Sequence, residues 1–128
     1  MTPLRSAYLH LATVAMDAAQ DGMRAPDVAA LGAAVTRELC GSWDHPPPCP
    51  LAPHHTRPEQ KGDTVTLRII FATEPANEAL VRSRIDGALR QGSLAGPDGR
   101  TSHWTFLGGG PGELEYSEAE HARRLTDS

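Results

Sequence analysis

Aromatic residues are scarce in this chain, which has only two each of Trp, Tyr and Phe among its 128 residues. Many of its hydrophobic residues are alanines, each of which buries little apolar area. A domain of this composition forms a thin core and gains from an additional source of stability, such as dimerisation or a bound metal ion. The length fits a single domain, 1–128.

The sequence also lacks a basic stripe and a long apolar run. Its formal charge is −4, and residues 113–128 carry five acids against two arginines. Nucleic acids and anionic membranes are therefore not expected as partners. No run is long enough to span a bilayer, and the apolar segment 4–19 is interrupted by polar residues, unlike a signal peptide. We expect a cytoplasmic protein.

Cysteine is rare as well, but its two copies lie close together and among histidines. Residues 40–55 hold both cysteines and three of the six histidines. In a reducing cytoplasm the cysteines are expected as thiols rather than as a disulfide. Zinc prefers thiolate and imidazole ligands, four of them in a structural site. The sequence therefore predicts a metal site with the candidate ligands Cys40, His45, Cys49, His54 and His55.

The spacing of these residues, C-x4-H-x3-C-x4-H-H, does not match the paired C-x2-C of common zinc fingers or ribbons. Zinc is the expected metal, with copper, nickel or iron as alternatives. If the segment around His54 and His55 is extended, their side chains point to opposite sides, so only one of them joins a single-ion site.

The same region is rich in proline. Residues 41–62 hold six of the eleven prolines and show no periodicity. A long connection without regular structure inside a domain is commonly functional, and Trp43 and Leu51 are unusual in disordered segments. We predict an ordered loop over 41–62.

On the amino-terminal side of this loop the pattern predicts an antiparallel helix pair, 3–40. Apolar residues recur at helical spacing from Leu4 to about Asp21, where Gly22 ends the run. A second helix begins near Pro26, and Gly41 would cap it. Cys40 would then lie in the last turn of that helix, at the start of the loop.

The second half, 63–126, is predicted to hold a small sheet and two helices. Residues 65–72 alternate as a strand does, and a helix begins at Glu74-Pro75 and ends near Gly92. A second strand follows at 102–107, Gly108 to Gly112 form a turn, and 114–116 form a short third strand. Ser117 and Glu120 resemble a capping box for a final helix.

These elements predict an α+β fold: a helix pair, a Cys/His/Pro loop, a β-α-β(-β) sheet and a short carboxy-terminal helix. Such a small sheet has open edges and an apolar face that it cannot cover by itself. We therefore expect a homodimer.

Three functions remain open at this point. The first is a structural metal clasp that joins the helix pair to the sheet. The second is an enzyme that uses the loop, either with an open metal position or with Cys49 as nucleophile, His54 or His55 as base and Asp44 orienting the imidazole. The third is a dimeric, non-catalytic interaction module. No substrate class follows from the sequence.

Overall fold

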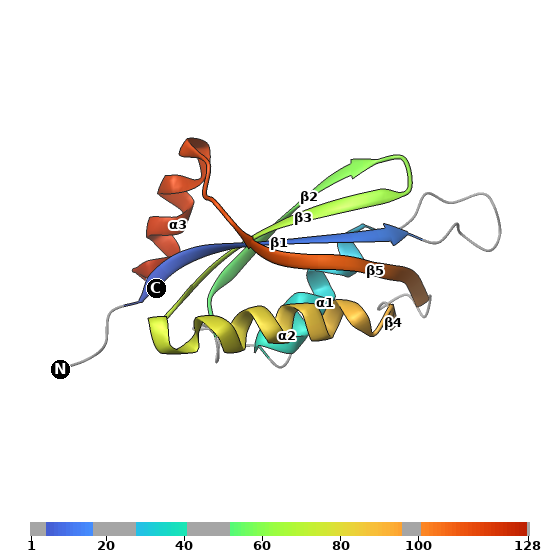
Figure 1. Cartoon of the computed structure of the whole chain (residues 1–128), viewed down its shortest axis with the longest axis horizontal. Coiled ribbons are helices and arrows are strands. Elements are labelled where there is room, and N and C mark those ends of the chain that lie inside the picture. Colours follow the sequence, from blue (N-terminus) through green and yellow to red (C-terminus); the bar gives the residue numbers. More distant parts are fainter. Residues whose placement is uncertain (1–4, 17–27, 41–51, 96–100, 128) are drawn as a thin grey trace.

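A computed structural model describes residues 5–16, 28–40, 52–95 and 101–127 (Figure 1). Its elements are, in chain order, β1 (Ser6–Met16), α1 (Ala29–Cys40), β2 (His54–Lys61), β3 (Thr64–Thr73), α2 (Glu78–Arg90), β4 (Ser93–Ala95), β5 (Thr101–Gly112) and α3 (Ala119–Thr126). Short 3₁₀ turns at Pro75–Asn77 and Tyr116–Glu118 lead into α2 and α3.

The five strands form one antiparallel sheet in the order β2-β3-β1-β5-β4. The strands β1 and β2 are connected through α1 and have β3 between them, and β3 and β5 are connected through α2 and have β1 between them. This arrangement of two split β-α-β units is the ferredoxin-like one. The topology by itself implies no function.

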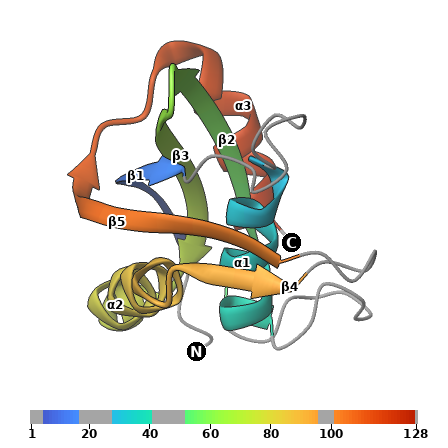
Figure 2. The same ribbon diagram turned by 90° about the vertical axis from the view of Figure 1, so that its right-hand side faces the viewer.

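The helices cover both faces of the sheet. Figures 1 and 2 show α1 and α2 on one face and α3 on the other. The larger apolar cluster lies beneath α1 and α2 and includes Phe71, Trp104 and Ile85, while a small cluster of Leu9, Ile70 and Ala122 lies beneath α3. Within the described residues, no helix is long and apolar enough to cross a membrane.

The predicted helix pair over 3–40, and with it the predicted fold class, is wrong. Its first half contains the strand β1, and the first described helix begins only at Ala29. The central strand β1 is apolar on both faces: Ala12 and Val14 face α1 and α2, whereas Leu9 faces α3. A strand buried on both faces has a near-continuous apolar sequence, and such a sequence also satisfies a helical pattern.

Two further predictions in the loop and the glycine-rich segment are also wrong. The predicted loop 41–62 contains β2, whose Pro58 and charged residues suit an edge strand. Gly108 to Gly112 do not form a turn but continue β5 along β1. Glycine and proline there indicated a turn, yet they occupy the last strand positions beside β1.

The carboxy-terminal end differs from its prediction as well. No strand forms at 114–116, where a 3₁₀ turn begins at Tyr116. The capping box joins Glu115 to Glu118 and not Ser117 to Glu120. By contrast, the strand over 65–72 is confirmed by β3, the helix after Pro75 by α2 and the final helix by α3.

Two glycines of β5 allow other groups to approach the strand closely. A Cβ atom on Gly109 would clash with Asp86 Oδ1 on α2 and would lie 3.1 Å from the Leu11 carbonyl oxygen. A Cβ on Gly112 would come within 2.8 Å of the Leu11 side chain. Glycine at position 109 therefore lets α2 bring Asp86 down onto the sheet.

The Gly109→Ala substitution should consequently destabilise the protein by about 1–3 kcal/mol, as overpacking does. Gly110→Ala is the matched control, because a Cβ on Gly110 would meet nothing within 4 Å. Urea unfolding of both variants measures the difference. Equal stability of the two would contradict the close approach of Asp86.

Candidate functional site

The structure describes three of the five predicted metal ligands. Cys40 is the last residue of α1, and His54 and His55 are the first two residues of β2. His45 and Cys49 lie outside the described residues. Cys40 follows Thr36 by one helical turn, which is about 6 Å along the helix axis, and Thr36 contacts His54. The last turns of α1 and the start of β2 are therefore in contact through Thr36 and His54.

The imidazole of His54 is held by hydrogen bonds at both ring nitrogens. Nδ1 lies 3.1 Å from the Ala52 carbonyl oxygen, and Nε2 lies 2.9 Å from Thr36 Oγ1. A carbonyl oxygen can only accept, so Nδ1 carries a proton and donates it to Ala52. In the neutral ring, Nε2 then has the lone pair and accepts from the Thr36 hydroxyl. The lone pair is thus directed toward α1.

His55 points to the opposite face of the sheet from His54. Its ring stacks on the His121 ring of α3, with centroids 4.2 Å apart and planes at 36°. Loss of hydration lowers the pKa of His55, and the neighbouring His121 and Arg57 lower it further. The expectation that His54 and His55 point apart is therefore confirmed, and the two imidazoles cannot share one ion.

No group of three or more His, Cys, Asp and Glu side chains suited to a metal ion occurs in the part of the chain that the structure describes. A site with four ligands would therefore need His45 and Cys49 in addition to the described residues.

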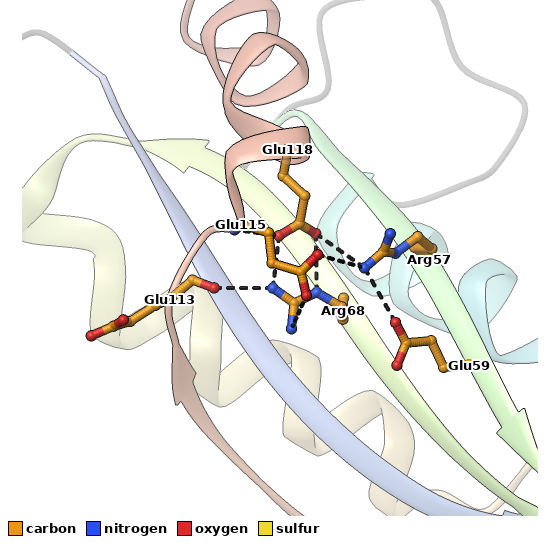
Figure 3. Close-up of polar contacts among 6 residues, drawn as sticks. All are labelled: Arg57, Glu59, Arg68, Glu113, Glu115 and Glu118. Atoms are coloured by element: carbon orange, nitrogen blue, oxygen red, sulfur yellow. Dashed lines mark hydrogen bonds and ion pairs between the residues drawn. The ribbon is translucent and has the colours of Figure 1, made fainter.

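A network of charged side chains occupies the face of the sheet that carries α3 (Figure 3). Arg57 of β2 and Arg68 of β3 are direct partners in the strand register. Like charges placed opposite each other destabilise a sheet, so this pair needs carboxylates nearby. Glu118 and Glu115, from the turn before α3, supply them.

Arg68 and Glu118 form the central pair of this network. The guanidinium donates from Nη2 to Glu118 Oε1 at 2.7 Å and from Nε to Oε2 at 3.1 Å, a two-pronged geometry that is among the strongest ion pairs. Nη2 also donates to the Glu113 carbonyl oxygen at 3.0 Å. The side chains of Glu118 and Arg68 are only 6% and 12% exposed.

The environment of Glu118 stabilises its ionised form. The hydrogen bonds from Arg68 lower the pKa of Glu118 against the opposing effect of burial, and the Glu115 amide, which donates to Glu118 Oε1 at 2.8 Å, lowers it further. The same pairing raises the pKa of Arg68. The Arg68–Glu118 pair therefore attaches the turn before α3 to the sheet.

A second polar cluster lies between β1 and α2. His10 is 1% exposed, and its Nε2 lies 2.7 Å from Asp86 Oδ1. Arg82 Nη1 lies 3.2 Å from His10 Nδ1 and donates to the Leu9 carbonyl oxygen at 2.8 Å. Since Arg82 can only donate, Nδ1 of His10 accepts its hydrogen bond. Nε2 of His10 therefore carries the proton and donates a hydrogen bond to Asp86. Both ring nitrogens are used and the ring is buried, so His10 is a structural residue.

The grouping of Arg57, Arg68 and Glu118 has no counterpart in the sequence pattern. Glu118 is one of five acids within residues 113–128, and only the fold brings it to Arg68, 50 residues earlier in the chain. No local pattern in the sequence signals that pairing.

Comparison with protein-family models, curated proteins and solved structures finds no match.

Replacing Glu118 by Gln should lower the free energy of unfolding by about 1.5–3 kcal/mol at neutral pH, because Arg68 loses its charged acceptor. Glu120→Gln is the control, since the ion pair of Glu120 with Arg124 is exposed on α3 and should contribute little. Denaturant unfolding measures both. A loss in Glu120→Gln as large as that in Glu118→Gln would contradict the argument.

The same pair predicts a dependence on pH. The pKa of Glu118 is lowered in the folded state. The ionised carboxylate therefore makes its full contribution to the free energy of unfolding above the usual glutamate pKa. This contribution is lost as pH falls through the pKa that Glu118 has in the folded protein. The gap in stability between wild type and Glu118→Gln should therefore shrink below about pH 5. A gap that stays constant down to acid unfolding would argue against an ionised Glu118 as its origin.

Proposed function

We propose that this protein binds one transition-metal ion, zinc in the first place, through Cys40, His45, Cys49 and His54. The ion acts as a structural clasp between the end of α1 and the beginning of β2. Two sulfur and two nitrogen ligands form a donor set that suits tetrahedral zinc. A reducing, cytoplasmic location would keep both cysteines available as thiolates.

The hydrogen bonding of His54 is the observation that carries this proposal. Histidines that bind metal usually donate their second ring N–H to a carbonyl or carboxylate, which fixes the tautomer and the direction of the ring. The Ala52 carbonyl oxygen accepts from Nδ1 of His54 in this way. The remaining nitrogen, Nε2, faces Thr36, so an ion bound to it would take the place of the Thr36 hydroxyl, which would turn away about its χ1 angle.

Chain connectivity also supports the proposed ligand set. Cys49 precedes the buried residue Ala52 by only three positions in the chain. Cys40 is anchored by α1 one turn beyond Thr36. The predicted ligands therefore start from two anchored ends that already contact each other through Thr36 and His54.

His55 is left out of this ligand set, which differs from the broader sequence-based group. Its side chain stacks with His121 on the other face of the sheet. The neighbouring residues His54 and His55 thus provide a matched pair for testing the proposal.

Purified untagged protein supplied with zinc should hold about one ion per chain. His54→Ala should lose most of this zinc, and Cys49→Ser should lower it too, whereas His55→Ala should retain it. Elemental analysis after dialysis gives the ratio. Absence of zinc, copper, nickel and iron from the wild type, or equal loss in His54→Ala and His55→Ala, would reject the site.

A clasp also makes metal binding a part of folding. Removing the ion with a chelator should lower the melting temperature by about 10 °C from that in zinc at roughly one hundred times its Kd. Acidification should have the same effect, because thiolate and imidazole take up protons and release the ion. A loaded protein whose melting temperature barely changes on chelation would favour an exchangeable, catalytic ion over a clasp.

A further inference from the structure

Among the described residues, no strand pairs with the outer edge of β5 over most of its length. β4 pairs only with Thr101, Ser102 and His103, and the Trp104 amide donates to the Gly92 carbonyl oxygen. From residue 105 to 112 the described structure shows backbone pairing with β1 alone. An unpaired edge of this kind offers a row of amide and carbonyl groups to another strand.

The side chains of this edge do nothing to repel another strand. Residues 105–112 include no ionisable side chain. Leu107, which has no partner in the register with β1, is 58% exposed. The opposite edge, β2, is different: it contains Pro58 and the charged residues Arg57, Glu59 and Lys61, which are features that protect an edge from pairing.

The best occupant of the open edge is a second copy of the same strand. An uncharged segment can lie antiparallel to itself about a two-fold axis without bringing like charges together, and that symmetry closes the assembly. Pairing of β5 with β2 of another copy would not close and would meet Pro58 and the charges of β2.

The strand register gives the position of the two-fold axis. Phe106 pairs with Val14 and Gly109 with Ala12 in β1, so positions 106 and 109 both face α1 and α2. An axis between Leu107 and Gly108 would place Phe106 of one copy opposite Gly109 of the other. This axis lies at the centre of the uncharged residues 105–110. Pro111 lacks an N–H, and this confines the new ladder to about residues 105–110.

We propose that the protein forms a two-fold homodimer by antiparallel pairing of the β5 edges. The apolar sheet face that the sequence suggested as the dimer contact does not take part, because Val65, Leu67 and Phe71 are buried beneath α1 and α2. The edge and the exposed Leu107 make the contact.

Light scattering coupled to size exclusion at micromolar concentration should give twice the 13.7 kDa of one chain. Leu107→Lys places a charge beside the axis and its own symmetry mate, and should give the mass of one chain. Leu80→Lys is the matched control, since Leu80 is also exposed (44%) but lies on α2; it should remain dimeric. A monomeric wild type, or dissociation by Leu80→Lys and not by Leu107→Lys, would overturn the proposal.

Hydrogen exchange of the wild type keeps the test decisive even if Leu107→Lys fails to fold. Amides in 105–110 should exchange several-fold more slowly as protein concentration rises, whereas amides of β2 should show no such change. Protection in 105–110 that is independent of concentration would refute pairing at this edge.

Discussion

The position of β1 at the centre of the sheet is the constraint on which the rest of this structure depends. Because β3 and β5 flank β1, only its two faces remain to be covered, and helices pack on both. The strand also buries a polar side chain, His10, and a buried imidazole without partners would cost about 1–3 kcal/mol. Arg82 and Asp86 of α2 supply those partners, and Asp86 reaches His10 only because position 109 is glycine. The packing of α2 and the sequence of β5 therefore both follow from one central strand.

The two faces of the sheet are closed in physically different ways. Beneath α1 and α2 the apolar cluster is large, so the hydrophobic effect suffices to hold the helices. Beneath α3 the apolar cluster is small, and among the described residues its buried centre consists of Leu9, Ile70 and Ala122. There the register places Arg57 opposite Arg68, and their like charges repel. The buried carboxylate of Glu118 forms ion pairs with both arginines, and these pairs hold the turn before α3 against the sheet. The turn before α3 thus compensates the charges of the sheet, and this face should be the more sensitive of the two to pH.

The sequence predicted those elements whose pattern has one interpretation. Residues 65–72 alternate and the segment after Pro75 has helical periodicity, and both appear as β3 and α2. Prediction of strands from the sequence pattern failed for β1, where burial on both faces removes the alternation of apolar and polar residues. It also failed for β2, an edge strand that contains proline and charged residues. The strand period correctly separated His54 from His55, but the pairing of Arg68 with Glu118 depends on topology and leaves no local signal. The metal-ligand set itself stays a prediction, since it combines described residues with His45 and Cys49.

The proposed clasp and the proposed dimer contact use opposite edges of the sheet. His54 begins β2 at one edge, and the unpaired part of β5 lies at the other, with β3 and β1 between them. Three strand spacings separate β2 from β5, which is about 14 Å. In a two-fold pair of β5 strands, the two β2 edges would be the outermost strands of a continuous sheet, and each clasp would lie away from the axis. Metal binding and assembly can therefore change independently, and an ion in the clasp would act on the dimer only through the stability of each chain.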